Sequence, residues 1–298
     1  MNRLKLSYFK LLELEHRPIF EHYLKEIKGL SSCEYNFRSL FVWKDSFPVK
    51  WAELNSRLLI YEEDEDYLLM PLGEKISASQ LRNISEVFIA SGLSGRYSFL
   101  REEDVEGIPG LDEFFKIHKN EGFGDYIYLS EKLATLRGPL SKKKNLVSQF
   151  RRNNPNYKCV APDKDMLLDC FCLAKEWAAA HGELSLTMKQ ELLALSRCLK
   201  YFEELSFEAL TLVDEGRLIA FSIFAPHDAK SYIINFEKSV ANAKGSSQTI
   251  NMEAALRIKN KGQYINREQD LGIPGLRKAK MSYYPDVFLN SYSLEPLL

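Results

Sequence analysis

The chain has 298 residues, of which 45% are hydrophobic and 27% charged, a composition typical of globular proteins rather than of disordered or fibrous ones. Its 40 basic and 41 acidic residues nearly cancel, so overall charge identifies no class of partner. No apolar run approaches the roughly 20 residues of a membrane-spanning helix, and the first residues have no signal-peptide core. We therefore expect a cytoplasmic protein without a transmembrane segment.

The first half of the chain predicts a mixed α/β unit. A helix is expected from Pro18 to about Lys28, and further helices near residues 79–91 and 110–120. The predicted strands cover residues 39–43, 51–54, 57–61, 67–71, 96–100 and 125–129. The acidic run at residues 62–66 lies between two apolar segments and predicts a solvent-exposed hairpin turn. We place a domain boundary near residue 130, giving domains 1–130 and 131–298.

The second half shows a more regular order of elements. A basic helix is expected from Lys142 to about Asn153, followed by a strand around Val160 and helices near residues 165–180 and 187–205. Three strands then follow at residues 209–213, 218–225 and 231–236, with Asp214-Glu215-Gly216 as the tight turn between the first two. A loop, a helix, a strand at Tyr264 and a polar helix complete the predicted unit.

The five cysteines are unevenly spaced and contain no C-x-x-C pair, so reduced thiols are expected. Cys170 and Cys172 lie in an apolar helical run, and we interpret them as a buried pair, with a metal or redox role as the alternative. The five histidines are scattered without metal-ligand spacing, so no metal site is predicted.

The segment from Ser231 to the helix after the loop predicts an anion site. A strand feeds a loop containing Lys244, Gly245, Ser246 and Ser247, and a helix follows. Such a loop directs backbone N–H groups and the positive end of the helix dipole toward one point, where a phosphate can bind. The alternative is an ordinary connection in which a serine caps the helix.

Three stretches resemble a known family. The run NREQDLGIPGLRKAK, from Asn266 to Lys280, resembles the C-terminal motif of a bacterial family related to the soluble C-terminal domain of phosphatidylglycerol lysyltransferase. FRSLFVW at residues 37–43 and KKKNLVSQF at residues 142–150 agree, so the resemblance covers nearly the whole chain. That family is similar to tandem GNAT (acyl-CoA N-acyltransferase) folds, as in Fem aminoacyl transferases. The resemblance implies an α/β fold of two GNAT-like halves, each a mixed, mostly antiparallel sheet flanked by helices, with the first half degenerate and the active site in the second.

The resemblance also implies roles for individual residues. Glu237, at the end of its strand, would accept a proton from the attacking group, and Tyr283 would protonate the leaving group. The alternatives are a salt bridge of Glu237 with Lys238 or Lys244, and a tyrosine that is simply packed in the core.

The strand at residue 264 adds further candidate residues. Asn266 and Glu268 share one face and could orient the acceptor, whereas Arg267 lies on the other face. Arg267 could bind an anion or pair with Glu268 or Asp270. The phosphates of the acyl donor are expected to be bound by the loop at residues 244–247 together with Arg267, Arg277 and Lys280.

Residues 132–162 contain no acidic side chain, which predicts a local positive field. The basic residues proposed to meet RNA or an anionic surface are Lys142, Lys143, Lys144, Arg151 and Arg152. A solvated helix face is the alternative. The sequence thus predicts an acyltransferase with an amine or hydroxyl acceptor and a donor that is either aminoacyl-tRNA or acyl-CoA. The competing hypotheses are a non-catalytic binding protein on the same scaffold and a protein that associates with anionic lipid.

Overall fold

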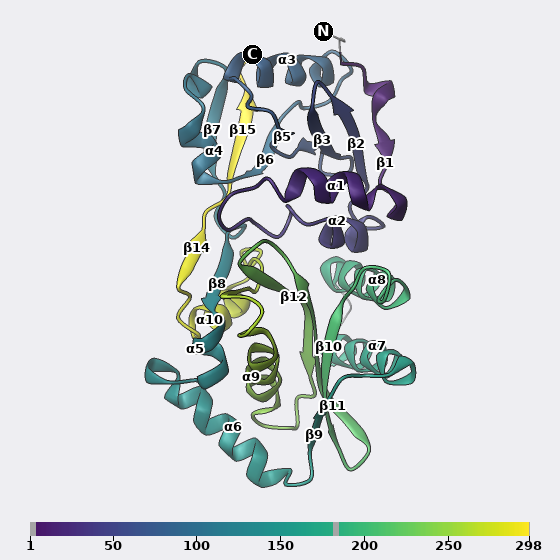
Figure 1. Ribbon diagram of the computed structural model, residues 1–298, viewed down its shortest axis with the longest axis vertical. Coiled ribbons are helices and arrows are strands. Elements are labelled where there is room, and N and C mark those ends of the chain that lie inside the picture. Colours follow the sequence, from purple (N-terminus) through teal and green to yellow (C-terminus); the bar gives the residue numbers. More distant parts are fainter. Residues whose placement is uncertain (1–3, 181–184, 298) are drawn as a thin grey trace. The chain divides into compact units, whose positions relative to one another are not determined.

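The computed structural model describes residues 4–180 and 185–297, and the chain divides into two compact units (Figure 1). The first unit comprises residues 1–125, 269–274 and 288–298, and the second comprises residues 126–268 and 275–287. The boundary expected near residue 130 would divide the chain once. In the structure, residues 269–274 and 288–298 also belong to the first unit. Within the described residues, no helix is both long and apolar enough to cross a membrane.

The first unit is built on a sheet with the strand order β1-β2-β3-β4-β6-β15-β7, in which β5 also pairs with β3. Neighbouring strands are antiparallel except for the parallel pair β4 and β6. The strands are β1 (Lys10–Leu11), β2 (Val49–Leu54), β3 (Arg57–Glu62), β4 (Tyr67–Leu68), β5 (Leu72–Gly73), β6 (Tyr97–Leu100), β7 (Phe115–Lys119) and β15 (Tyr292–Pro296). The helices are α1 (Arg17–Leu24), α2 (Phe37–Trp43), α3 (Ala78–Ile89) and α4 (Glu102–Gly107), with short 3₁₀ turns η1 (Leu6–Tyr8), η2 (Leu14–His16) and η3 (Leu111–Glu113).

Two predictions for the first unit are wrong. Residues 39–43, expected as a strand, lie in α2, because the Asn36 side chain caps that helix by accepting hydrogen bonds from the backbone N–H groups of Arg38 and Ser39. The helix expected at residues 110–120 is instead η3 followed by β7, which pairs with β15. That strand partner lies about 175 residues later in the sequence, so no local pattern indicated it.

The second unit has a sheet with the strand order β14-β8-β13-β12-β11-β10-β9. The β12–β13 pair is parallel, and the pairs β8–β13, β11–β12, β10–β11 and β9–β10 are antiparallel. The strands are β8 (Asp125–Leu129), β9 (Lys158–Val160), β10 (Glu208–Asp214), β11 (Arg217–Pro226), β12 (Ser231–Ser239), β13 (Tyr264–Asn266) and β14 (Val287–Leu289). The helices are α5 (Ser130–Thr135), α6 (Ser141–Asn153), α7 (Lys164–Ala179), α8 (Leu186–Lys200), α9 (Ser246–Ile258) and α10 (Pro274–Met281), with the 3₁₀ turn η4 (Gly138–Leu140).

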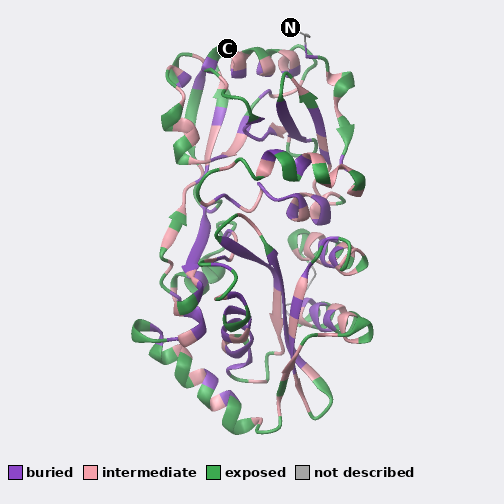
Figure 2. Ribbon diagram, in the orientation of Figure 1, coloured by how far each residue is buried: buried purple, intermediate pink, exposed green. Residues whose placement is uncertain are grey.

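Helices cover both faces of the second sheet, with α9 on one side and α7 and α8 on the other (Figure 1). The central strands β11 and β12 are accordingly buried over most of their length, whereas α6 is largely exposed (Figure 2). The core on the α9 side includes Phe224, Ile234, Ala255 and Ile258. The order of elements predicted for this half of the sequence is confirmed.

An extra residue interrupts the pairing of β11 with β12. Ile223 lies opposite Phe236, whereas Phe224 lies opposite Ile234, so Asn235 has no partner residue in the register. A bulge of this kind bends a strand and redirects its side chains, and bulges are common beside functional sites. Here it lies two residues before Glu237.

The cysteine prediction is wrong in part. All five cysteines are free, as expected, and Cys170 is buried. Cys172 is exposed, because residues two apart on a helix point to different sides. The two thiols therefore do not form a buried pair.

Candidate functional site

A partly buried ion pair links two neighbouring parallel strands of the second unit. Arg267, which follows β13, donates from Nη2 to Glu237 Oε1 on β12 at 3.0 Å. Burial opposes the charge of Arg267, but the negative charge of Glu237, together with Tyr283 and Tyr128, outweighs it and raises the pKa of the guanidinium. The alternative that the sequence left open for Glu237, a salt bridge with Lys238 or Lys244, is wrong. Lys238 instead pairs with Glu191 at 2.8 Å.

Tyr283 lies against this ion pair, after the end of α10. The Arg267 guanidinium carbon is 5.0 Å from the centre of the Tyr283 ring, and Lys143 Nζ is 4.4 Å from it. Burial raises the pKa of Tyr283 to about 12, although hydrogen bonds with Gln248 and Arg267 oppose the shift. Burial and the charge of Arg267 together lower the pKa of Lys143. The phenol therefore keeps its proton at neutral pH and can act as a proton donor. We call Glu237, Gln248, Arg267 and Tyr283 the β12/β13 site.

Several buried polar atoms near these strands have no hydrogen-bond partner among the described residues. They include Glu237 Oε2, both side-chain amide atoms of Asn235, Ser222 Oγ and Asn251 Oδ1. Ser222 lies directly opposite Glu237 in the β11–β12 register. Buried polar groups are nearly always paired with protein or water, so unpaired ones mark a place for a ligand or for ordered water.

Asn266 and Glu268, the other predicted catalytic residues, hydrogen-bond within the chain. Asn266 is fully buried, and its Oδ1 accepts from the Glu268 backbone N–H at 2.7 Å. Glu268 has a φ of 58°, and its carbonyl accepts from the N–H of Tyr126. Because consecutive residues of an extended chain point to opposite faces, Asn266 lies on the face away from Arg267. The structure thus brings Glu237 and Tyr283 together, and these contacts of Asn266 and Glu268 shape the end of β13.

The predicted phosphate loop is packed against helix α6. Gly245 has a φ of 90°, and a Cβ atom placed on it would lie 2.2 Å from the carbonyl oxygen of Leu146. Ser246 is almost fully buried, whereas Lys244 and Ser247 are exposed. Glycine is therefore required at residue 245 both for its backbone conformation and for the close approach of α6.

The remaining predicted anion-binding residues differ in exposure. Lys280 is buried, and its Nζ donates to the backbone carbonyl of Arg267, so it ties α10 to the end of β13. Arg277 is exposed.

The basic helix α6 presents most of its charge to solvent. Lys142, Lys144 and Arg152 are exposed, and Arg151 pairs with Glu253 at 3.1 Å. Lys143 differs, because it is half-buried and faces the ring of Tyr283. Of the three consecutive lysines, Lys142 and Lys144 therefore lie on the surface, and Lys143 lies at the β12/β13 site.

Sequence reasoning missed Gln248 and Asn235 as well as this position of Lys143. Gln248 lies in the first turn of α9, where its side chain reaches Tyr283. Its closeness to Gly245 in the sequence was the available signal. Asn235 is a polar residue in an otherwise apolar strand interior, which is a second signal that the sequence contains.

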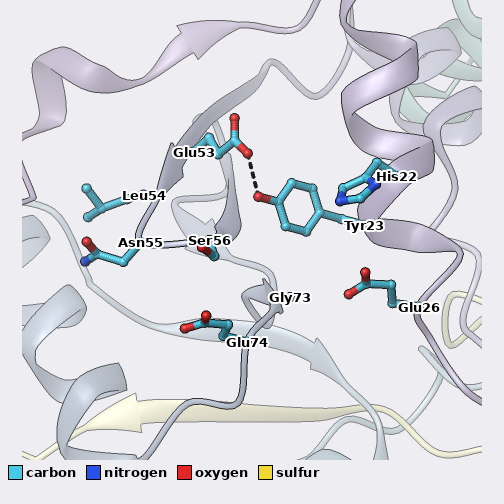
Figure 3. A pocket seen from close by; sticks show the side chains of 9 residues that line it. All are labelled: His22, Tyr23, Glu26, Glu53, Leu54, Asn55, Ser56, Gly73 and Glu74. Carbon is cyan, nitrogen blue, oxygen red and sulfur yellow. Dashed lines mark hydrogen bonds between the residues drawn. The ribbon is translucent and has the colours of Figure 1, made fainter.

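A separate acidic pocket lies in the first unit (Figure 3). Its volume is about 480 Å³, and Glu26, Glu53 and Glu74 line it together with His22 and Tyr23. Tyr23 donates to Glu53 at 2.5 Å, and burial followed by this hydrogen bond raises the pKa of Tyr23 to about 12. No residue predicted from the sequence as part of a site lies in this pocket.

Comparison with known proteins gives a family and a fold. The family described as "Phosphatidylglycerol lysyltransferase, C-terminal" matches residues 26–295. The comparison with curated proteins finds no match for this chain.

Three solved structures are similar. A conserved protein of unknown function from Bacteroides thetaiotaomicron is 27% identical with a TM-score of 0.90, and the match covers 97% of this chain and 99% of that one. L-PGS from Bacillus licheniformis is 16% identical with a TM-score of 0.58, covering 93% of this chain and 91% of that one. A tandem GNAT protein from the clavulanic acid biosynthesis pathway is 8% identical with a TM-score of 0.51, covering 96% and 98% respectively. The predicted α/β fold of two GNAT-like halves is confirmed.

Proposed function

Because the chain belongs to the family of the phosphatidylglycerol lysyltransferase C-terminal region, we propose that it transfers an aminoacyl group from tRNA to a hydroxyl or amine acceptor. The observation that carries this proposal is the β12/β13 site. There a carboxylate, a guanidinium and a protonated phenol converge on one face of the second sheet. General acid–base catalysis of acyl transfer needs a proton acceptor within reach of the attacking group and a proton donor within reach of the leaving group.

Glu237 is the proposed base. Arg267 occupies its Oε1 and leaves Oε2 without a hydrogen-bond partner among the described residues. The acceptor oxygen or nitrogen attacks the ester carbonyl while its proton passes to Oε2. The bond between the carbonyl carbon and the ribose oxygen of the tRNA then breaks.

Tyr283 is the proposed acid. Its hydroxyl gives a proton to the departing ribose oxygen, and the adjacent Arg267 stabilises the phenolate that forms. The proton held by Glu237 returns to Tyr283 through solvent, which restores both groups. Arg267 therefore holds the carboxylate of Glu237 in place and stabilises the negative charge of the Tyr283 phenolate.

The region around α6 favours tRNA over coenzyme A as the donor. Gly245 is packed against the Leu146 carbonyl oxygen, and the Ser246 N–H already donates to the carbonyl of Ala243, which argues against a carrier pyrophosphate at this loop. The exposed lysines Lys142 and Lys144 on the same helix suit the phosphates of a nucleic acid backbone. An anionic lipid surface would use the same charges, and the binding experiments below separate the two.

The test uses radiolabelled aminoacyl-tRNA and vesicles that contain phosphatidylglycerol, the acceptor in the family's name. We expect label in the extracted lipid, and a loss of about 100-fold or more in kcat for Tyr283→Phe. Tyr284→Phe is the matched control, because Tyr284 is adjacent in the sequence but 54% exposed. Thermal melting of both variants reports whether they fold.

Three outcomes would contradict the proposal. Product formed only from acyl-CoA would show that the donor is wrong. Equal activity of the Tyr283 and Tyr284 variants would remove Tyr283 from the reaction. Binding of tRNA without product from any donor or acceptor would favour a non-catalytic binding protein.

A further inference from the structure

A second group of reactive side chains lies in the first unit. Cys33, Glu34 and Asp125 each place a potential ligand atom within 4.8 Å of the others. The Cys33 backbone N–H donates to Asp125 Oδ2 at 2.7 Å. The Cys33 thiol lies 3.5 Å from Asp125 Oδ1 and 3.4 Å from Glu34 Oε1. Residues that are about 90 positions apart in the chain thus meet at one sulfur atom.

Gln269 closes the group from a third segment of the chain. Its Nε2 donates to Glu34 Oε1 and lies 3.4 Å from Cys33 Sγ. Asp125 is fully buried and Gln269 nearly so. Segments that are far apart in sequence therefore enclose the cluster.

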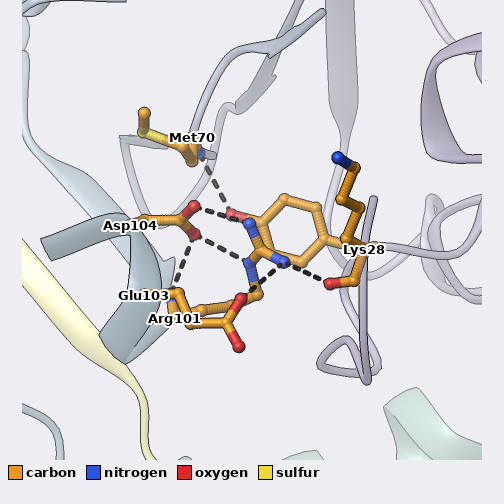
Figure 4. Close-up of polar contacts among 6 residues, drawn as sticks. Lys28, Met70, Arg101, Glu103 and Asp104 are labelled. Atoms are coloured by element: carbon orange, nitrogen blue, oxygen red, sulfur yellow. Dashed lines mark hydrogen bonds and ion pairs between the residues drawn. The ribbon is translucent and has the colours of Figure 1, made fainter. Parts of the chain in front are cut away.

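The surrounding contacts fix the segment that carries Cys33 and Glu34. Arg101 bonds to Asp104 and to the carbonyl of Lys28, as Figure 4 shows. Tyr35, directly after Glu34, is buried, and its hydroxyl accepts from the Met70 N–H at 3.2 Å. The ligand atoms are thus held in place on both sides, as a preorganised site requires.

One carboxylate oxygen of the cluster is unsatisfied. Glu34 Oε2 is shielded from solvent and has no hydrogen-bond partner among the described residues. Burial, followed by the negative charge of Asp125, raises the pKa of Glu34 to about 7. A cation bound between the two carboxylates would satisfy the free oxygen and remove their repulsion.

We propose that Cys33, Glu34 and Asp125 bind a divalent zinc ion, which ties two distant segments of the first unit together. Thiolate with carboxylate favours zinc over magnesium or calcium, which take oxygen ligands only. Zinc bonds of about 2.0–2.3 Å in a tetrahedron place ligand atoms about 3.5 Å apart. Small side-chain rotations close the present spacing to that value, and a water molecule would complete the tetrahedron.

Binding is an exchange of protons and water for metal. The S–H bond of Cys33 breaks, its proton passes to solvent and a zinc–sulfur bond forms. A proton on Glu34 leaves in the same way, and zinc releases the waters that these ligands replace. The step needs no oxidant or reductant, and it does not depend on the proposed transferase activity.

The experiment uses the full chain without an affinity tag, treated with chelator and then titrated with Zn²⁺ against a chromophoric chelator. We expect one equivalent of zinc, a higher melting temperature, and at least a tenfold loss of affinity in Cys33→Ser and in Glu34→Gln. Cys172→Ser is the matched control, because that thiol is exposed and lies outside the cluster. Substitution with Co²⁺ should give a thiolate-to-metal charge-transfer band that Cys33→Ser abolishes.

Glu34→Gln keeps the test decisive if Cys33→Ser does not fold, since it preserves size and hydrogen bonding. The proposal is overturned if wild-type protein binds no stoichiometric zinc, or if both cluster variants bind as wild type does. It is equally overturned if lysine methyl ester, an organic ammonium, raises the melting temperature in a Glu34-dependent way while Zn²⁺ does not. That result would assign the cluster to an amine.

Discussion

Replacing Gly245 by alanine should destabilise the second unit mainly by forcing helix α6 away from the loop before α9. The new methyl carbon would lie 2.2 Å from the Leu146 carbonyl oxygen and 3.0 Å from Phe150 Cβ. Ordinary contact distances are near 3.5 Å, so the helix or the loop must move by about 1 Å. The clash is with backbone, which a side-chain rotation cannot relieve.

Two contributions add at this position. A left-handed backbone conformation costs a residue with a Cβ about 1–2 kcal/mol. Overpacking of a tight contact adds about 1–3 kcal/mol. Part of the sum is offset because alanine reduces the freedom of the unfolded chain by about 0.4–1 kcal/mol. The expected net loss in the free energy of unfolding is therefore about 3 kcal/mol.

Gly216→Ala is the matched control. Gly216 has a φ of 78°, also left-handed, but no atom lies within 4 Å of its would-be Cβ. Both glycines lie in the second unit, so backbone strain and the unfolded-state effect nearly cancel between the variants. The difference between them isolates the contact with α6, and we expect about 2 kcal/mol.

Urea unfolding followed by circular dichroism measures both variants against wild type. Equal losses for Gly245→Ala and Gly216→Ala would show that α6 does not press on the loop in solution. The argument against coenzyme A at this loop would then fail too, because it rests on the same contact.

Three further outcomes are expected. Changing both Lys142 and Lys144 to alanine should weaken tRNA binding. The change should also lower the magnitude of the slope of log affinity against log salt by up to about two. Binding to vesicles of anionic lipid without any binding to tRNA would contradict this prediction. In metal-free protein, Glu34 holds its proton to about pH 7 when folded but only to its ordinary value of 4.5 when unfolded. The free energy of unfolding should therefore fall by up to roughly 3 kcal/mol as the pH rises from 4.5 to about 7, and it should level off above that. Melting measured across this pH range should show no such fall for Glu34→Gln. Glu237→Ala should lower the free energy of unfolding by about 3 kcal/mol, because it leaves the Arg267 charge without its carboxylate partner. Changing both residues to methionine should cost less in chemical unfolding. Additive losses would mean that the pair is not coupled.

The sequence predicted the second unit well because its elements are local. Strand, turn, helix and loop signals between Lys142 and Lys280 each act within a few residues, and the order of elements follows from them. The same reasoning failed at Phe37–Trp43, where the alternation of aromatic side chains suggested a strand. The segment is a helix because Asn36 caps its N-terminus and its buried side chains, Phe37, Phe41 and Val42, lie at helical spacing.

The candidate site could be predicted only in part, because its pairings cross between strands. Glu237 and Tyr283 were identified as candidates, but Arg267 was expected to bind an anion or to pair with Glu268 or Asp270. Its partner in the structure is 30 residues away, on the parallel neighbour strand. The Cys33 cluster was missed for the same reason, since metal-ligand spacing along a sequence cannot reveal ligands from distant segments.

Strand β15 is the next-to-last strand of the first sheet, lying between β6 and β7, yet it follows the second unit in the sequence. On the ribosome, β6 and β7 must therefore wait without their shared neighbour until the second unit has been synthesised. The N-terminal portion is then a slow, late-completing folder, whereas the segment from Tyr126 onward can collapse first. Expression of residues 1–130 alone should yield a chain with an open sheet edge that aggregates, and adding a peptide of residues 288–298 should restore its solubility.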